Sequence, residues 1–360
     1  MEKSVVHVGE AEISEESGMG RVAWHWREAF QQAGYRFIHI GPAAIGGFVH
    51  PALFPSRAFE AFKRLGVKPW VCLVHEPAAA PFVKRFPGAI VFSHGLERRA
   101  WEDLLRSPES RKEVRFRSRI LFPLWRLRGC DFGLKRARGA LVINQDDRDY
   151  AYERYGRTPE NTFLFRNGVY LSATSFAPGS GGGNILFVGS WISRKGIKTL
   201  VETARILHEL KFQCRFTLAA TGFDEEAVLR DWPADLRPLV KVIPCFKREA
   251  EAGLFSTATL FVMPSFSEGQ PLALLQAMEA GLCCVTTDCC GQKDLIRNGE
   301  NGFLFPPGDA LALATLIGVC LRDAALRERL GRRARESVSQ RSWAATSREV
   351  KEWVERIASN

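Results

Sequence analysis

Short apolar segments alternate with segments of helical spacing throughout this chain, and this alternation limits the folds that it can adopt. In the first half we expect strands at residues 5–8, 37–40, 71–74, 89–92 and 141–143, with a helix at residues 22–30. In the second half we expect strands at residues 185–188, 216–219, 260–263 and 283–287, with a helix at residues 198–210. Such alternation is typical of parallel sheets that carry helices on both faces. The pattern therefore predicts an α/β protein with two doubly wound, Rossmann-like domains.

A glycine-rich segment separates the two halves. Residues 176–184 read FAPGSGGGN, which is typical of a flexible linker. A chain of 360 residues is long enough for about two domains. We therefore expect an N-terminal domain at residues 1–175, a C-terminal domain at residues 185–340 and a final helix at residues 341–360. Doubly wound domains bind ligands at the carboxyl ends of their strands, so a cleft between the two is the expected site.

One strand–loop–helix segment has the composition of an anion-binding site. The expected strand at residues 260–263 leads into a loop that carries one carboxylate, Glu268. A helix with Pro271 near its first turn follows and ends at Gly281, as helices commonly do. Backbone amides at a helix N-terminus favour an anion such as a phosphate, and the residues that would supply them are Gly269, Gln270 and Leu272.

The spacing of two side chains in this segment indicates what the anion belongs to. Glu268 and Gln276 are eight residues apart, about two helical turns, so we expect both to face one ligand, one at each end. A sugar nucleotide fits this arrangement, with its diphosphate in the middle, its sugar at one end and its ribose at the other.

Residues 264–281, PSFSEGQPLALLQAMEAG, resemble the signature of the retaining glycosyltransferases of sequence family 4, in which seven residues separate two glutamates. The second glutamate is Gln276 in this chain. Residues 285–309, VTTDCCGQKDLIRNGENGFLFPPGD, continue the likeness. The resemblance implies the GT-B architecture, in which two Rossmann-like domains face each other across a cleft and the last helix crosses back to the first domain.

The resemblance also implies roles within this segment. Glu268 would face the donor sugar as a catalytic residue, and the diphosphate would lie at the helix N-terminus. Gln276 would contact the ribose. An amide can still form hydrogen bonds with the ribose hydroxyls, but it lacks the negative charge that strengthens the hydrogen bonds of a glutamate. We therefore expect weaker donor binding than a second glutamate would give.

Three further segments match the family's donor and acceptor loops. Residues 17–22, SGMGRV, resemble its glycine turn beneath the donor diphosphate, with Gly18 and Gly20 allowing close approach. Residues 189–196, GSWISRKG, resemble its diphosphate clamp, in which Lys195 matches the lysine, Ser190 replaces the arginine and Arg194 is a substitute cation. His94, in the segment SHG, matches a catalytic histidine that approaches the donor sugar, whereas His75 receives no role.

The activity implied by the resemblance is retaining transfer of a hexosyl unit from a nucleoside-diphosphate sugar, with UDP favoured and GDP second. The acceptor would be a cell-surface polysaccharide, a glycolipid or a lipid-linked oligosaccharide. No suitable D-x-D carboxylate pair is present, so no metal or other cofactor is expected. Two alternatives stay open: a non-catalytic nucleotide-sugar-binding or partner-docking protein, suggested by Ser190 and Gln276, and a sugar-nucleotide 2-epimerase on the same fold.

The formal net charge is +10, and much of the excess lies between residues 98 and 138. Basic residues alternate there with apolar and aromatic ones, and the basic members include Arg111, Lys112, Arg115, Arg117, Arg119, Arg126 and Arg128. A solvated helix face with core residues behind it is one interpretation, and an anionic membrane surface or a lipid-phosphate acceptor is the other. Nucleic acid is not an expected partner, because no nucleic-acid-binding motif accompanies the charge.

The N-terminal residues bear on the location of the protein, and the spacing of the cysteines bears on whether they form a motif. The first residues, MEKSVVHV, resemble a first strand and lack the long apolar region of a signal peptide. We therefore expect a cytoplasmic protein, with peripheral attachment to the inner face of the membrane as a variant of that expectation. None of the nine cysteines forms a C-x-x-C motif, and Cys283 and Cys284 are interpreted as small apolar residues of a buried strand.

Overall fold

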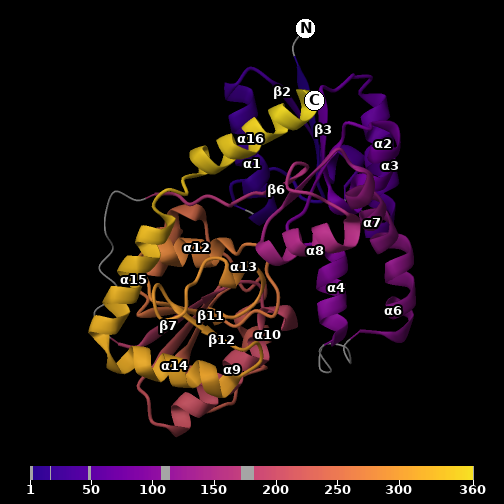
Figure 1. Cartoon of the computed structure of the whole chain (residues 1–360). Coiled ribbons are helices and arrows are strands. Elements are labelled where there is room, and N and C mark those ends of the chain that lie inside the picture. Colours follow the sequence, from indigo (N-terminus) through magenta and orange to yellow (C-terminus); the bar gives the residue numbers. More distant parts are fainter. Residues whose placement is uncertain (1–2, 17, 48–49, 107–113, 172–181, 360) are drawn as a thin grey trace. The chain divides into compact units, whose positions relative to one another are not determined.

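The computed structural model of the protein describes residues 3–16, 18–47, 50–106, 114–171 and 182–359. The chain divides into two compact units (Figure 1). The first unit is Met1–Asn167 together with Trp343–Asn360, and the second unit is Gly168–Ser342. The chain passes between the units twice, once at residues 167–168 and once at residues 342–343. The two passages lie side by side, because Val169 N donates to the carbonyl of Arg341 at 2.7 Å. Most of the predicted linker at residues 176–184 lies outside the described residues.

A six-stranded parallel sheet in the order β2-β1-β3-β4-β5-β6 forms the centre of the first unit. Its strands are β1 (Ser4–Val8), β2 (Arg36–Ile40), β3 (Val71–His75), β4 (Ile90–Phe92), β5 (Gly139–Val142) and β6 (Thr162–Leu164). All five residues of β3 are buried. Such burial explains the continuous apolar runs of these strands, because helices cover both faces of a parallel sheet.

The helices of the first unit follow the strands in turn. They are α1 (Gly18–Gln32), η1 (Ala43–Ile45), η2 (Pro51–Leu53), α2 (Phe54–Arg64), η3 (Glu76–Ala78), α3 (Ala79–Arg85), α4 (Glu97–Arg106), α6 (Phe116–Phe122), the π-helical turn η4 (Pro123–Leu127), α7 (Arg128–Arg136), α8 (Gln145–Tyr155) and α16 (Trp343–Ser359). Helices α2, α3 and α7 pack on one face of the sheet, where Phe62 and Phe82 are buried.

The last helix, α16, belongs to the first unit and lies beside α1 (Figure 1). The ring of Trp343 stacks on His25 with 4.4 Å between the centroids. Trp353 covers Gly139 of β5, where an added Cβ would lie only 2.7 Å from the indole. Glycine is therefore required at this position, because any larger side chain would displace the helix.

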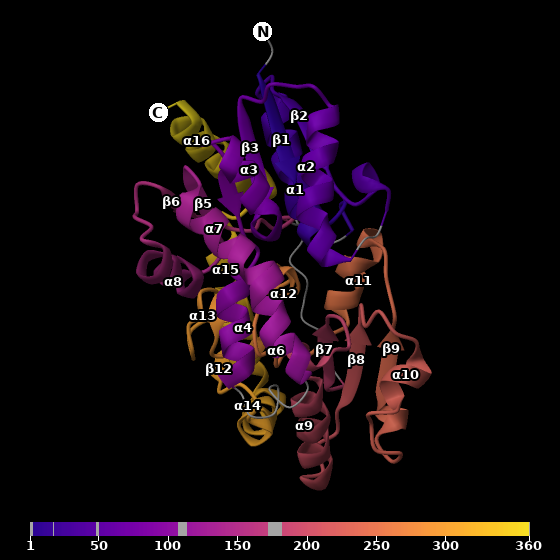
Figure 2. The ribbon, with the colours of Figure 1, turned by 90° about the vertical axis from the view of Figure 1, so that its right-hand side faces the viewer.

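The second unit repeats the plan with a parallel sheet in the order β12-β11-β10-β7-β8-β9. Its strands are β7 (Asn184–Val188), β8 (Arg215–Ala219), β9 (Val240–Ile243), β10 (Leu260–Met263), β11 (Cys284–Thr287) and β12 (Phe303–Phe305). Figure 2 shows β7, β8 and β9 side by side. The side chains of β8 contribute to two hydrophobic clusters. Phe216 and Leu218 lie in one cluster, and Ala219 lies in the other.

Helices and short helical turns connect the strands of the second unit. They are η5 (Ser193–Lys195), α9 (Ile197–Glu209), α10 (Glu225–Leu229), η6 (Arg237–Leu239), η7 (Arg248–Ala250), α11 (Glu251–Ser256), α12 (Leu272–Glu279), α13 (Cys290–Lys293), α14 (Ala310–Arg322) and α15 (Ala324–Val338). Helices α9 and α14 pack together, and α12 packs on α15.

The predicted fold class is confirmed, since both units are doubly wound α/β structures with parallel sheets. The sequence did not predict β6, β9 and β12, and each of these strands lies at an edge of its sheet. The structure buries Cys283 and Cys284, as predicted, and the two side chains belong to different hydrophobic clusters. Within the described part of the chain, no helix combines the length and the apolar character needed to cross a bilayer.

Candidate functional site

The loop at residues 264–269, between β10 and α12, is held against its neighbours on two sides. On one side it contacts Gly196, which has a φ of 72° and lies so close that a Cβ would overlap the carbonyl oxygen of Pro264. Phe266 N donates to the carbonyl of Arg194 at 2.9 Å across the same contact. Only glycine permits this approach and this backbone angle, so Gly196 brings the two loops together.

On its other side the loop contacts the segment that follows β11. A Cβ on Gly291 would overlap the carbonyl oxygen of Gly269. Two side chains from this segment also bind the loop, since Thr287 Oγ1 donates to the carbonyl of Ser265 at 2.5 Å and Gln292 Nε2 donates to it at 3.2 Å. The loop that carries Glu268 is therefore fixed by backbone packing and hydrogen bonds on both sides.

These contacts place one carboxylate between two cations. Lys195 Nζ lies 2.6 Å from Glu268 Oε1, and an amino nitrogen of Arg194 lies 3.4 Å from the same oxygen. Arg194 also donates to the carbonyl of Ser267 at 2.5 Å. Glu268 is only 9% exposed, whereas the Arg194 side chain is 47% exposed. The cluster thus combines a buried ion pair with a second cation that remains accessible to solvent.

The ionisation of Glu268 follows from its neighbours. Burial by itself raises the pKa of this carboxyl, because it disfavours the charged form. The charges of Lys195 and Arg194 outweigh that effect and hold the pKa of Glu268 below the ordinary value of a glutamate. The carboxylate is therefore ionised at neutral pH and can accept hydrogen bonds from hydroxyl groups.

Helix α12 begins at Leu272 with Pro271 as its N-cap, and Gly281 follows its end with a φ of 75°. Gly269 and Gln270 lie directly before this N-terminus. The positive end of the helix dipole therefore lies beside the cluster of Glu268, Lys195 and Arg194, in the surroundings that a diphosphate favours.

Glu268 lies in the loop, as expected, and Gln276 lies on the helix, so helical spacing does not relate the two side chains. The residue before a proline disfavours the helical backbone, so α12 cannot extend back beyond Pro271. The loop contacts, and not helical spacing, set the position of Glu268. Gln276 lies within α12, and its Nε2 donates to Glu251 Oε1 of α11 at 2.5 Å.

One cysteine in the segment after β11 has an unusual backbone. Cys290 has a φ of 47°, which is rare for residues other than glycine. It lies next to Gly291, and its Sγ lies 3.8 Å from Ser267 Oγ in the Glu268 loop. The strained backbone therefore lies directly beside the loop that carries Glu268.

The two glycines predicted beneath the donor diphosphate lie within α1 and not in the turn before it. Helix α1 begins at Gly18, and Gly20 accepts a bond from Ser14 N at 3.3 Å. The expected glycine turn is therefore wrong in its backbone, because the chain is already helical at these residues. Both glycines still lie in the first turn of a helix, where the N–H groups have no partner within the helix.

Four histidines gather near the carboxyl ends of the strands in the first unit. His7 Nδ1 lies 2.9 Å from His39 Nδ1 on the neighbouring strand, and the rings of His75 and His94 are 5.6 Å apart. Burial lowers the pKa of His75 and that of His94 to about 3. His94 is therefore neutral at physiological pH, as its expected role requires. Sequence reasoning missed His7 and His39, because a lone histidine in a strand carries no signal.

An ion-pair network lies beside these histidines. Arg126 binds both carboxylate oxygens of Glu10, at 2.9 and 2.8 Å, and donates to Glu97 at 2.7 Å. Next to it, Glu76 Oε2 accepts from Ser93 Oγ at 2.7 Å, and burial raises the pKa of Glu76 to about 8. A pocket opens onto this network, and its lining consists of Glu10, Pro42, Ile45, Gly47, Pro51, Phe54, Glu97, Phe122, Trp125 and Arg126.

The basic stretch at residues 98–138 has two different parts. Arg98, Arg99 and Arg126 form ion pairs within the unit, the first with Asp131 and the second with Asp147. The other part is exposed and lies on α6 and η4. We call its large apolar residues the α6 patch, which consists of Phe116, Ile120, Leu121, Leu124 and Trp125. Three arginines beside the patch are exposed, namely Arg115, Arg117 and Arg128, whereas Arg111 and Lys112 lie outside the described residues.

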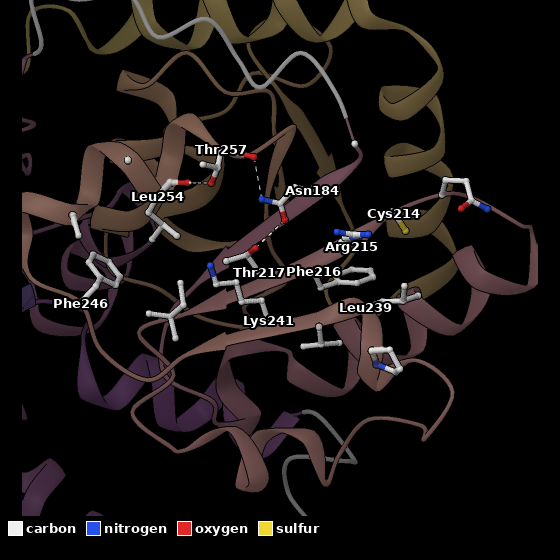
Figure 3. A pocket seen from close by; sticks show the side chains of 17 residues that line it. Asn184, Cys214, Arg215, Phe216, Thr217, Leu239, Lys241, Phe246, Leu254 and Thr257 are labelled. Carbon is white, nitrogen blue, oxygen red and sulfur yellow. Dashed lines mark hydrogen bonds between the residues drawn. The ribbon is translucent and has the colours of Figure 1, made fainter.

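A larger hollow lies on one face of the second sheet (Figure 3). It is lined by Asn184 and Arg215, the first residues of β7 and β8, and by Lys241 and Phe246. Asn184 accepts from Thr217 Oγ1 at 2.9 Å in its floor. Parallel α/β sheets bind ligands at the carboxyl ends of their strands, and this hollow includes the opposite ends. It is therefore separate from the site built around Glu268.

Comparisons with known proteins give relatives of one kind. Residues 182–323 match the family model described as Glycosyl transferases group 1. The phosphatidyl-myo-inositol mannosyltransferase of Mycobacterium leprae is 26% identical over 229 residues, which span 62% of this chain and 60% of that protein. The amylovoran biosynthesis glycosyltransferase AmsK of Erwinia amylovora is 33% identical over 141 residues, which span 37% of this chain and 34% of that protein. The chain thus spans less than two thirds of the length of either relative.

Solved structures show the same fold at low identity. The sucrose-phosphate synthase from Thermosynechococcus elongatus superimposes with a TM-score of 0.81 at 19% identity, with 99% of each chain covered. WaaG, a glycosyltransferase involved in lipopolysaccharide biosynthesis, gives a TM-score of 0.74 at 14% identity, with 97% of this chain and 99% of that chain covered. The GT-B fold predicted from the motifs is confirmed, and the match to the family model extends over residues 182–323.

The ion pair at the centre of the site can be tested through stability. Substitution Lys195→Met leaves the buried carboxylate of Glu268 with only the exposed Arg194, and we expect it to lower the free energy of unfolding by about 3 kcal/mol. Chemical denaturation at pH 7 measures the loss. Because the pKa of Glu268 is lowered by folding, the loss should shrink as the pH falls below the ordinary glutamate range.

Two further variants control this measurement. Lys241→Met removes an exposed lysine from the edge strand β9 and should change stability by less than about 0.5 kcal/mol. The double variant Lys195→Met/Glu268→Gln should recover much of the loss, because no buried charge remains without its partner. Equal stabilities for the Lys195 and Lys241 variants would contradict the assigned ion pair.

Proposed function

We propose that the chain transfers a hexosyl unit from a nucleoside-diphosphate sugar to a carbohydrate or lipid-linked acceptor, with retention of configuration, because residues 182–323 match the family model of glycosyl transferases group 1. UDP is the favoured nucleotide and GDP the second. The proposed reaction requires no metal. Support for UDP comes from a structural neighbour, Anabaena HepE, whose structure contains UDP and glucose.

The observation that carries the proposal is the cluster of Glu268, Lys195 and Arg194 at the N-terminus of α12. Two cations and the helix dipole suit the diphosphate, and the ionised carboxylate suits the hydroxyls of the donor sugar. An ammonium group has three N–H donors, so Lys195 can bind Glu268 and a phosphate oxygen at the same time. The cluster can therefore bind both parts of a donor without losing its own ion pair.

In the proposed reaction the bond between the anomeric carbon and the diphosphate oxygen breaks, and its electron pair leaves with the nucleoside diphosphate. An acceptor hydroxyl forms the new bond on the same face, and its proton passes to the departing phosphate. Lys195 and Arg194 stabilise the charge that the diphosphate gains. Glu268 stabilises the positive charge that develops on the sugar, because the transition state has oxocarbenium character.

In the proposed reaction, the first unit binds the acceptor. His94 is neutral, so its ring can accept a hydrogen bond from a sugar hydroxyl. The pocket beside Arg126 combines aromatic walls, which include Phe122 and Trp125, with charged groups at its floor. Such a lining suits an acceptor that has both apolar and hydroxyl-bearing parts. Phosphatidyl-myo-inositol, named in one relative, has this character.

We propose that the α6 patch binds an anionic membrane surface. Five large apolar side chains are exposed within ten residues, and three exposed arginines flank them. An amphipathic helix with this composition is typical of attachment to an anionic bilayer surface. Phe122 and Trp125 also line the acceptor pocket, so a surface-bound enzyme would have that pocket close to lipid-linked acceptors.

The transfer proposal is tested by turnover of UDP- and GDP-hexoses in the presence of EDTA, with bacterial lipid extracts and polysaccharide fragments as acceptors. Release of nucleoside diphosphate should depend on the acceptor. The variant Glu268→Ala should lower turnover at least about 100-fold, because it removes charge stabilisation in the transition state. Glu300→Ala, an exposed carboxylate of the same unit, should leave turnover unchanged.

Three results would contradict parts of this proposal. Intact turnover in Glu268→Ala would mean that the donor sugar lies elsewhere. Hydrolysis or epimerisation of the donor without any acceptor would favour the 2-epimerase. A wild-type protein that binds nucleotides but turns over no donor would favour the non-catalytic alternative.

The membrane surface is tested by co-sedimentation with phosphatidylglycerol vesicles. The double variant Ile120→Ser/Leu124→Ser should reduce binding at least about tenfold, because it removes two exposed apolar side chains from the patch. Leu210→Ser/Leu311→Ser, which removes two leucines of slightly greater exposure from the second unit, is the matched control. Equal binding of both variants would contradict the role of the α6 patch.

A further inference from the structure

A glutamate that the proposed reaction does not use lies buried at the carboxyl end of the first sheet. Glu76 follows directly after β3, at the start of η3, and is 0% exposed. Carboxyl groups are almost never buried completely unless they are paired or hydrogen-bonded. A fully buried group cannot touch a substrate, so Glu76 can influence a ligand only through the residues that it contacts.

Both oxygens of Glu76 accept hydrogen bonds from the loop that joins β4 to α4. Ser93, the residue after β4, donates through Oγ to Glu76 Oε2 at 2.7 Å. The backbone nitrogen of Glu97 donates to Oε1 at 3.2 Å and to Oε2 at 3.3 Å. Glu97 is the first residue of α4, where a backbone N–H has no partner within the helix. Glu76 therefore binds both ends of this loop.

His94 lies between the two bound ends of the loop. On one side of it, the backbone nitrogen of Ser93 donates to the carbonyl of Leu141 at 2.9 Å. On the other side, Gly95 N donates to Ser93 Oγ at 3.2 Å, and Gly95 has a φ of 137°, which side chains larger than hydrogen disfavour. The backbone on both sides of His94 is therefore fixed, and Ser93 Oγ connects it to Glu76.

The ring of His94 packs among other rings of the first unit. Its centroid lies 5.6 Å from those of His75 and Phe92 and 6.1 Å from that of Phe165. These contacts flank the ring, whereas the loop sets the place from which the side chain extends. A displacement of the loop would therefore move the ring relative to a bound sugar hydroxyl.

We propose that Glu76 is a positioning residue for His94, which it holds in place through Ser93 and the first backbone amide of α4. The inference rests on the function proposed above, in which His94 accepts a hydrogen bond from a sugar hydroxyl. Accurate placement matters there, because a misplacement of about 1 Å can lower turnover about 100-fold.

Glu76 does not need a negative charge for this role. Burial and the nearby charge of Glu97 raise the pKa of Glu76 to about 8, so its carboxyl is mostly neutral at pH 7. The oxygen of a neutral amide has two lone pairs and can accept from both Ser93 Oγ and Glu97 N. Glutamine is therefore the conservative replacement at this position, whereas alanine removes both bonds.

A double-variant cycle on the full chain tests whether Glu76 acts through His94. Transfer is measured at pH 7 from a radiolabelled UDP- or GDP-hexose to the lipid or polysaccharide fraction that supports wild-type turnover. Glu76→Ala and Ser93→Ala should each lower kcat about tenfold or more. In a His94→Ala background each should change kcat less than about twofold, because the side chain that they position is absent. Glu76→Gln should keep kcat within about threefold of the wild-type value.

Two controls separate positioning from support of the fold. Phe62→Leu removes buried packing on α2, where the ring of Phe62 contacts Phe82 and Phe86, and it should lower stability without changing kcat. Binding of UDP or GDP should be equal in all variants, because Glu268 and Lys195 lie in the second unit. Thermal unfolding shows which variants are folded, and the Ser93→Ala cycle is decisive where Glu76→Ala is not.

Equal losses of kcat with and without His94 would overturn this inference and leave the proposed transfer intact. A loss in Glu76→Gln as large as that in Glu76→Ala would also overturn it, since glutamine retains the hydrogen bonds. An unchanged kcat in His94→Ala would overturn the role of His94, and this inference with it. A wild-type protein that transfers no hexose would overturn the proposed function itself.

Discussion

The candidate site depends on the close packing of three backbone segments in the second unit. Gly196 contacts the carbonyl of Pro264, and Gly291 contacts that of Gly269, so the loop that carries Glu268 is confined between two glycines. Neither contact leaves room for a Cβ. The approach brings Lys195 within 2.6 Å of Glu268 and places both beside the N-terminus of α12. The electrostatics of the site therefore follow from backbone packing that side chains larger than hydrogen would prevent.

The sequence predicted the central strands well because burial on both faces requires continuous apolar runs. It failed for β6, β9 and β12, which lie at sheet edges. An edge strand is short and half-solvated, so polar residues such as Lys241 interrupt its pattern. The structure brings Lys195 and Glu268, which come from two of the motifs, within 2.6 Å of each other. Tight turns and close backbone contacts need glycine at fixed positions, and glycine is visible in a sequence.

Other parts of the site depend on contacts that spacing cannot reveal. Glu251 and Gln276 are 25 residues apart and meet only because α11 packs beside α12. Helical spacing does not relate Glu268 to Gln276, because Pro271 lies between them as the N-cap of α12. In the first unit, strand register brings His7 beside His39. Each case is a tertiary contact, for which the local pattern carries no information.

The central claim is that the cluster of Glu268, Lys195 and Arg194 binds a nucleoside diphosphate without a metal. Thermal unfolding with EDTA and a panel of nucleoside diphosphates tests it most directly. A ligand at 100 times its dissociation constant stabilises the folded state by about 2.7 kcal/mol, which gives a clear rise in Tm. The account predicts such a rise with UDP or GDP and its loss in Lys195→Met. No rise with any nucleotide, or an equal rise in that variant, would contradict it.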